Sequence, residues 1–241
     1  MPDAPLLSVV VPVLDERDNI IPLVTEIVSA LRGCVPFEIV YVDDHSTDGT
    51  AEVLRTLKPA IPELRVFRHA FRVGQSTAIR NGVTASRGEW IATLDGDGQN
   101  DPADLPRLIA ELERAGPNVK LLAGWRVDRR DGAGKRWASR LANAIRSGVL
   151  RDSTPDTGCG TKLFERAAFL ELPYFDHMHR YLPALMQRAG WTTLNVAVNH
   201  RPRSAGASKY GNLSRALLGL VDLFGVAWLL RRARVVRVQE L

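Results

Sequence analysis

The first half of the chain alternates between short apolar segments and amphipathic segments, and this alternation restricts the fold more than any other feature. Residues 6–11 form a continuous, β-branched run, as expected of a strand buried on both faces of a parallel sheet. Further apolar segments span residues 37–42, 64–67, 90–94 and 119–124. Helical patterns follow at residues 19–32, 50–58, 75–85 and 102–115. The alternation predicts an α/β domain with a mostly parallel central sheet flanked by helices.

Pairs of carboxylates come directly after three of these predicted strands. The pairs are Asp15/Glu16, Asp43/Asp44 and Asp95/Asp97. Parallel strands end on one edge of a sheet, so we expect the three pairs to converge there. Capping of the next helix explains one pair, but it needs a single acceptor and explains three pairs less well. Paired carboxylates suit Mg²⁺ or Mn²⁺, and such a cation usually accompanies a phosphorylated substrate.

The segment from Trp90 to Pro102 has the strongest chemical signal, because Asp95 and Asp97 arrive as its strand ends. A calcium loop is the first alternative, since Asp95, Asp97 and Gln99 occupy alternate positions. That loop requires Gly and Glu where Asn100 and Pro106 stand, so the pattern fails. Asp101 is suited to cap a helix that has Pro102 in its first turn.

Several common sites are excluded by spacing. The glycines between residues 74 and 82 do not match a Walker or dinucleotide loop, which argues against an NTPase and a dehydrogenase. Cys34 and Cys159 form no metal or redox spacing, and a reduced cytosolic protein is the expectation. His177 and His179 are expected in the core or on the surface, without a metal. The apolar N-terminal run lacks a preceding basic region and predicts a strand, not a signal peptide.

The second half is basic, and the net charge of the chain is +5. Such a charge admits a nucleic acid, an anionic membrane or a phosphorylated substrate as partner. Few aromatic residues accompany the Lys and Arg residues, so we exclude nucleic acid. Residues 135–150 form an amphipathic helical pattern, and residues 213–230 form an apolar one followed by arginines. The apolar segment is too short to span a bilayer, which leaves an interfacial helix or a core-packed helix.

Four motifs, taken together, resemble the nucleotide-binding half of inverting family-2 glycosyltransferases, which have the Rossmann-like GT-A fold. They span residues 9–16, 42–50, 74–82 and 94–99. Three later segments resemble polyprenyl-phosphate glycosyltransferases of the dolichyl-phosphate mannosyltransferase type. They span residues 135–140, 156–163 and 203–210. The resemblance covers nearly all of residues 6–210.

The resemblance implies a role for each matching residue. The nucleotide would be bound by Pro12, Asp15, Glu16, Asp43, Asp44, Gly74 and Gln75. The metal would be held by Asp95, Asp97 and Gln99. The catalytic residues would be Asp95, Asp97, Asp156 and Arg126. The acceptor and phosphates would be bound by Arg136, Ser139, Arg140, Lys162, Arg203, Ser208 and Lys209. Gly98 replaces a usual Leu, and Lys162 stands where Arg is common, which weakens its assignment because Lys cannot grip a phosphate bidentately.

The implied reaction is metal-dependent transfer of a hexose, with mannose favoured, from a nucleotide sugar to a polyprenyl phosphate with inversion. GDP-mannose is the favoured donor and a UDP-hexose the second. The phosphate of the acceptor is already ionised near neutral pH and needs no strong enzymic base. Transfer to a saccharide with Asp156 as base is the alternative. A catalytically inactive sugar-binding module is a third reading, against which the intact Asp95 and Asp97 argue.

The same resemblance divides the chain into three parts. Residues 1–125 would bind the nucleotide sugar and residues 126–212 would form a basic acceptor-binding half of the same domain. Residues 213–241 would form a C-terminal apolar helix and a basic tail. We expect a peripheral protein on the cytoplasmic face of the membrane.

Overall fold

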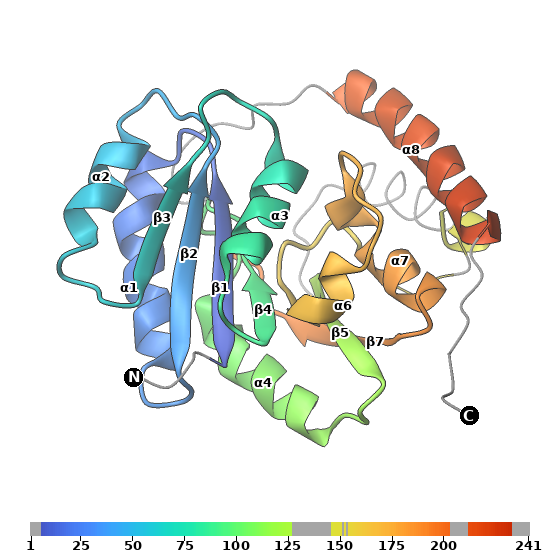
Figure 1. The fold of residues 1–241 in the computed structure, drawn as a ribbon, viewed down its shortest axis with the longest axis horizontal. Coiled ribbons are helices and arrows are strands. Elements are labelled where there is room, and N and C mark those ends of the chain that lie inside the picture. The colour runs from blue at the N-terminus through green and yellow to red at the C-terminus, as the bar shows by residue number, and fades with distance from the viewer. Residues whose placement is uncertain (1–5, 127–145, 151, 153, 203–211, 233–241) are drawn as a thin grey trace, which may run out of the picture.

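The computed structural model describes residues 6–126, 146–150, 152, 154–202 and 212–232, and within them one sheet of seven strands dominates (Figure 1). The order of the strands is β3-β2-β1-β4-β6-β5-β7. The strands are β1 (Leu7–Val13), β2 (Phe37–Asp43), β3 (Leu64–Arg68), β4 (Trp90–Thr93), β5 (Val119–Arg126), β6 (Lys162–Glu165) and β7 (Thr192–Val198). The predicted α/β class and mostly parallel sheet are therefore confirmed.

Strand β6 is the one reversed strand among the described elements, and the sequence analysis did not predict it. It pairs antiparallel with both β4 and β5, whereas the other neighbours in the sheet run parallel. Its four residues begin with Lys162 and end with Glu165. Such a short run with charged ends has no measurable periodicity, so its pairing comes from the two long neighbours that enclose it.

Helices cover both faces of the sheet (Figure 1). The helical elements are α1 (Arg17–Leu31), α2 (Thr50–Leu57), α3 (Gln75–Ala85), η1 (Pro102–Asp104), α4 (Leu105–Arg114), α6 (Arg166–Leu170), η2 (Met178–Arg180), α7 (Leu182–Arg188) and α8 (Asn212–Arg232). Val10 of β1 belongs to the core cluster that includes residues of α3, α6 and α7, whereas Val9 and Val11 belong to the cluster that includes residues of α1, α2 and α4. This alternation explains why β1 has a continuous apolar sequence. Of the helix predicted over residues 135–150, only residues 146–150 are described, and they are helical.

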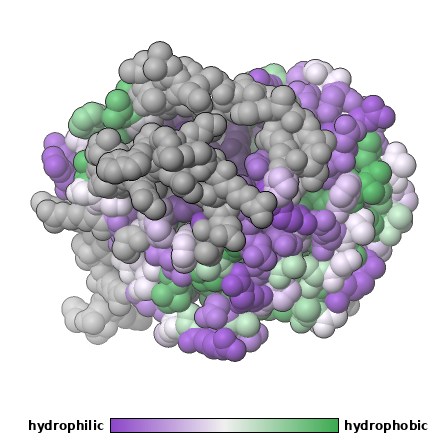
Figure 2. Space-filling model, turned by 180° about the vertical axis from the view of Figure 1, so that it is seen from behind, coloured by the Kyte–Doolittle hydropathy of each residue, from purple (hydrophilic) through white to green (hydrophobic). Residues whose placement is uncertain are grey.

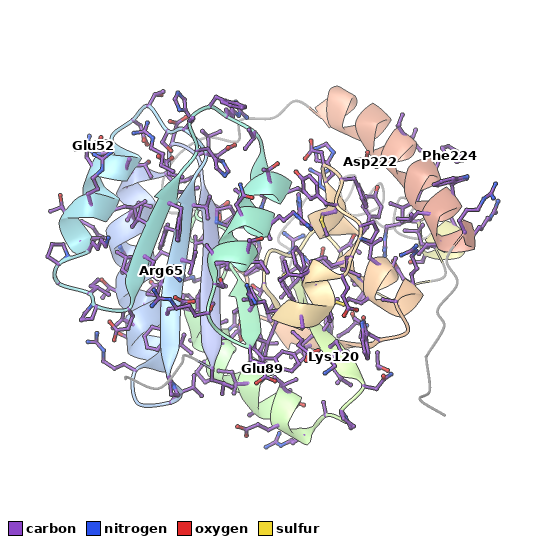
Figure 3. All side chains as sticks on the ribbon, in the orientation of Figure 1. Glu52, Arg65, Glu89, Lys120, Asp222 and Phe224 are labelled. Atoms are coloured by element: carbon purple, nitrogen blue, oxygen red, sulfur yellow. The ribbon has the colours of Figure 1, made fainter. Side chains whose placement is uncertain are left out.

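Helix α8 contains the apolar segment whose sequence admits either an interfacial or a core-packed helix. Leu223 and Val226 are buried in the core, so one side of α8 packs on the protein. Val221, Phe224 and Trp228 are 70%, 70% and 61% exposed on the other side. Figure 3 shows Phe224 pointing outward. Among the described helices, none is long and apolar enough to cross a bilayer.

The surface seen from behind the view of Figure 1 has a mixed hydropathy. Figure 2 shows that hydrophilic and hydrophobic residues are intermixed over the part of that surface that the structure describes. Exposed apolar side chains among hydrophilic ones are ordinary on a folded protein. The exposed apolar residues of α8 differ because they follow one another on a single helix.

A buried polar network holds the amino ends of the strands, at the opposite edge of the sheet from the predicted site. Glu38 of β2 is 5% exposed and accepts hydrogen bonds from Ser8 Oγ (2.7 Å), Arg87 N (2.6 Å) and Arg65 Nη1 (2.7 Å). Burial raises the pKa of Glu38, but these hydrogen bonds and the charge of Arg65 outweigh it and leave the pKa below its ordinary value. Figure 3 shows Arg65 beside β2.

Glu38→Gln should therefore destabilise the protein by about 2–3 kcal/mol at pH 7, because one amide N–H₂ would face buried donors. A carboxyl group with a depressed folded-state pKa stabilises the fold above its unfolded pKa, and the contribution disappears as the pH falls through the folded value. Urea unfolding of both proteins from pH 7 to pH 3 measures this. A difference that does not shrink toward pH 3 would contradict the assignment.

Candidate active site

A cavity of about 520 Å³ lies at the carboxyl ends of β1, β2 and β4. Many of the residues singled out in the sequence contribute to its lining. They are Pro12, Glu16, Asp44, Gln75, Asp95, Asp97, Gln99, Arg126 and Lys162. Each of the three carboxylate pairs supplies at least one member, so the structure brings the pairs together as expected.

Three of the remaining predicted residues do not line this cavity but lie next in sequence to residues that do. Asp15 Oδ1 accepts from Thr47 N at 2.7 Å, and Asp43 Oδ1 accepts from Ser46 N at 2.8 Å. Gly74 precedes α3 with φ +96°, a conformation that favours glycine. Six predicted residues lie outside the described part of the chain, so their positions stay predictions. They are Arg136, Ser139, Arg140, Arg203, Ser208 and Lys209.

Asp95 is held in place through both its carboxylate and its backbone. Gln75 Nε2 donates to Asp95 Oδ1 at 2.9 Å, and Asp95 N donates to Asn100 Oδ1 at 2.7 Å. A Cβ atom at Gly160 would lie 2.2 Å from Asp95 Oδ2, so only glycine permits this approach. Burial and the charge of Asp97 together raise the pKa of Asp95 to about 6, although Lys162 lowers it in part.

These residues fit a hard divalent cation. Burial and the charge of Asp97 raise the pKa of Asp95, and a bound cation would favour the charged form of this carboxylate. Within the described residues, no group of three or more His, Cys, Asp and Glu side chains could hold a metal by itself. Two carboxylates that leave positions for water and substrate phosphates are typical of Mg²⁺ and Mn²⁺ sites. Gln99 N donates to Asp97 Oδ1 at 3.1 Å, beside this pair.

Arg126 and Asp156 form a bidentate ion pair at the end of β5. Arg126 Nε and Nη2 lie 2.6 and 2.9 Å from the two oxygens of Asp156. Burial lowers the pKa of Arg126, but its hydrogen bonds to Asp156 outweigh this and raise the pKa overall. Because both oxygens of Asp156 already accept from a cation, the geometry disfavours its use as a general base for a saccharide acceptor.

Lys162 lies at the base of the cavity, 4% exposed, where β6 begins. Its Nζ donates to the carbonyl oxygen of Cys159. Burial lowers the pKa of Lys162, while the nearby Cys159, Asp95 and Asp156 act in the other direction. Lys162 is therefore a buried cation whose charge also favours the charged form of Asp95, and binding of a phosphate stays a prediction.

The structure adds residues that the sequence analysis did not select for the site. Arg180 and His179 of η2 line the cavity, and Ser76 Oγ lies 2.6 Å from His179 Nδ1. The sequence indicates only a core or surface position for His179, whereas the structure places it in the lining of the cavity. Asn100 and Gly160 position Asp95 from two loops. No local pattern marks these residues, because η2 reaches α3 only in the folded chain.

Comparison with known proteins identifies relatives along almost the whole chain. A family model described as glycosyl transferase family 2 matches residues 8–172. The dodecaprenyl-phosphate galacturonate synthase of Rhizobium johnstonii is 34% identical over 236 residues, which cover 93% of this chain and 67% of that protein. The undecaprenyl-phosphate 4-deoxy-4-formamido-L-arabinose transferase of Edwardsiella ictaluri is 32% identical over 220 residues, covering 90% and 65%. The chain thus spans about two thirds of the length of these relatives.

Solved structures share the fold at lower identity. The mannosyltransferase PcManGT of Pyrobaculum calidifontis, in complex with GDP-Man and Mn²⁺, has a TM-score of 0.70 at 20% identity and covers 98% of this chain and 67% of that chain. Glucosyl-3-phosphoglycerate synthase of Mycobacterium tuberculosis, with UDP and Mn²⁺, has a TM-score of 0.68 at 18% identity and covers 97% and 81%. The fold of this chain is that of GT-A glycosyltransferases, and by its family-model match and its relatives the chain belongs to glycosyl transferase family 2.

Proposed function

We propose that the protein transfers a sugar from a nucleotide-diphosphate sugar to a polyprenyl phosphate, with inversion at the anomeric carbon and dependence on Mg²⁺ or Mn²⁺. The observation that carries the proposal is the placement of Asp95 and Asp97 beside Arg126 and Lys162 in one cavity at the carboxyl edge. Carboxylates for a cation and cations for phosphates are the two sets of groups that this reaction requires. The names of the two relatives support the polyprenyl phosphate.

The two ends of the cavity suit different parts of the donor. Pro12 and Glu16 line it at the end of β1, where the base and ribose would lie. Asp95 and Asp97 would hold the cation, which neutralises the donor diphosphate when bound. Residues 1–125 then form the nucleotide-sugar half of the domain and residues 126–212 the acceptor half.

The described side chains favour positioning over proton transfer. Arg126, held by Asp156, offers a fixed positive charge for the diphosphate that leaves the sugar. The lipid phosphate attacks the anomeric carbon from the face opposite that leaving group, which inverts the configuration. Its second pKa is about 6, so an oxyanion nucleophile is present at neutral pH without an enzymic base.

The donor is the finer part of the proposal. GDP-mannose is the first donor to test, because the complex of PcManGT contains GDP-Man. The named relatives transfer galacturonate and a formamido-arabinose, so UDP-hexoses and a nucleotide-activated galacturonate belong in the same assay. Product analysis by thin-layer chromatography with an undecaprenyl phosphate acceptor, and with free saccharides as alternative acceptors, tests the proposal. Transfer to a saccharide alone would contradict it.

A membrane surface is the proposed partner of α8. Val221, Phe224 and Trp228 leave an apolar side unpaired with the rest of the described chain, and Arg231 and Arg232 at the end of α8 are exposed. Arg232 also lies over the ring of Trp228, with its guanidinium carbon 5.8 Å from the ring centroid. Apolar side chains next to arginines suit an anionic bilayer surface. The protein would then act as a peripheral protein on the cytoplasmic face, where the lipid phosphate lies.

Asp95→Asn should lower turnover at least about a hundredfold, because a carboxylate that would hold the cation is lost. In EDTA the same variant should unfold at a higher temperature than the wild type at pH 8. The raised pKa of Asp95 means that its charged form costs stability in the folded protein above pH 6, and this cost vanishes below about pH 4. The gain in Tm should disappear over the same range.

Asp101→Asn is the matched control for Asp95→Asn. Asp101 belongs to the same loop, but its side chain accepts from Ala103 N at 3.0 Å outside the cavity. Its activity should equal that of the wild type. Activity of Asp95→Asn with Mg²⁺ or Mn²⁺ near the wild-type value would refute the metal assignment.

Replacing Phe224 and Trp228 together by Ser should weaken binding to phosphatidylglycerol vesicles at least about tenfold, since burying an aromatic side chain contributes about 1.5–3 kcal/mol. The Tm should change little because both side chains are largely exposed. Flotation at low salt measures binding. Phe71→Ser is the control, because Phe71 is 69% exposed on the loop between β3 and α3. Equal flotation of both variants would exclude α8 as the docking surface.

A further inference from the structure

We infer that Arg201 is a positioning residue: it ties the loop of residues 94–101, which contains Asp95 and Asp97, to the segment that follows β7. Arg201 lies outside the lining of the cavity as the described residues define it, so it acts through other residues of this loop. The inference rests on the proposed function, since Asp95 and Asp97 matter through the cation that they would hold.

The backbone at Arg201 pairs with this loop. Arg201 N donates to Gln99 O at 3.0 Å, and Gln99 Nε2 donates to Arg201 O at 3.5 Å. An isolated antiparallel bridge joins Asn100 to His200, the residue before Arg201. The segment after β7 therefore runs beside the loop after β4, although β4 and β7 are not neighbours in the sheet.

The Arg201 guanidinium adds a second connection, between the loop and α1. Its Nη1 and Nη2 donate to the two oxygens of Glu26, at 3.1 and 2.7 Å, and Nη2 also donates to Asn100 O at 3.2 Å. Two parallel hydrogen bonds to one carboxylate fix the plane of a guanidinium. Glu26 therefore sets the direction from which Arg201 reaches Asn100.

Asn100 and Gln99 transmit this restraint to the carboxylates. Asn100 is 2% exposed, and its Oδ1 accepts from Asp95 N at 2.7 Å. Gln99 N donates to Asp97 Oδ1 at 3.1 Å. The two residues that Arg201 holds are thus the two that contact Asp95 and Asp97. Groups that orient the ligands of a metal typically change metal affinity or activity by about 10–100-fold when they are removed.

The test compares Arg201→Ala, Glu26→Ala and the double variant in the full chain. Without the guanidinium, Asn100 loses a hydrogen bond and its link to α1, so exchange of the Asp95 amide hydrogen should accelerate in the metal-free protein. Mn²⁺ affinity, followed by the EPR signal of Mn²⁺ in the presence of UDP or GDP, should fall about tenfold in Arg201→Ala. Glu26→Ala should lie between the wild type and Arg201→Ala. The double variant should equal Arg201→Ala, because both changes act on one contact.

Arg201→Lys separates positioning from an effect of charge. Removal of a positive charge by itself favours binding of a cation, so a lower Mn²⁺ affinity in Arg201→Ala would have the opposite sign to a charge effect. Lys keeps the charge but has no planar fork that can bind both oxygens of Glu26. The Mn²⁺ affinity of Arg201→Lys should therefore also fall.

Arg32→Ala is the matched control. Arg32 follows α1 and makes a similar forked contact, with its Nε and Nη2 at 3.2 and 2.9 Å from Glu63 Oε1. Among the described residues, neither Arg32 nor Glu63 lines the cavity. Loss of this ion pair should leave exchange of the Asp95 amide and Mn²⁺ affinity at their wild-type values, whatever its effect on the Tm.

Three results would overturn the inference. They are unchanged exchange of the Asp95 amide in Arg201→Ala, wild-type Mn²⁺ affinity in Arg201→Ala or Arg201→Lys, and losses of affinity that multiply in the double variant. A raised KM for the polyprenyl phosphate at unchanged Mn²⁺ affinity would instead assign Arg201 to the acceptor. If Arg201→Ala does not fold, Glu26→Ala alone must show the faster exchange, since the side chain of Glu26 is 42% exposed.

The same measurements separate this inference from the proposed function. Hydrogen exchange needs neither metal nor substrate, so a wild-type protein that transfers no sugar would refute the proposed function and leave the restraint on Asp95 measurable. A wild-type protein without Mn²⁺ affinity would overturn the role of Arg201 toward the cation.

Discussion

The burial of the Asp95 carboxylate next to Asp97 is the constraint on which the rest of the site depends. Burial disfavours the charged form of the Asp95 carboxylate, the charge of Asp97 adds to this effect, and together they raise the pKa of Asp95 to about 6. The charges of Lys162 and Arg126 lower this pKa only in part. A cation and a diphosphate can complete the balance, which is why a site of this kind is costly when empty and suited to substrates of high charge.

The position of this uncompensated charge follows from the strand order. The chain starts with β1, adds β2 and β3 on one side, and then places β4 on the other side. The order therefore changes direction between β1 and β4, and a crevice opens at their carboxyl ends, where α/β sheets bind ligands. At the amino ends, by contrast, the Glu38 carboxylate accepts hydrogen bonds from Ser8, Arg65 and Arg87. The buried carboxylate at the amino edge thus finds its hydrogen-bond donors within the protein. At the carboxyl edge, the charged form of Asp95 would be stabilised further by a bound cation.

The sequence predicted the parts of this arrangement that have a local signal. Strand β1 and helix α3 were predicted to within a few residues, because apolar runs and helical spacing are local properties. The convergence of the carboxylates followed from the rule that parallel strands end together. Strand β6 and element η2 were not predicted, since four residues and three residues carry no periodicity. The partners of the Asp44 carboxylate could not be predicted for another reason: His69, Val73 and Gly74 belong to the loop between β3 and α3, whose path depends on the whole sheet.

Helix α8 connects the proposed membrane surface with the cavity through its inward side. Asp222 Oδ2 lies 3.0 Å from His177 Nδ1, and the Tyr181 hydroxyl donates to Gly219 O at 3.2 Å. Both contacts flank η2, the element that brings His179 and Arg180 to the cavity wall. His177 also has a φ of +63°, a backbone conformation that a non-glycine residue keeps only when its surroundings hold it. The proposed membrane surface of α8 is thus joined by two hydrogen bonds to the residues that flank η2, and η2 in turn contacts α3 through His179 and Ser76. The cavity wall formed by η2 is therefore held both by α8 and by α3.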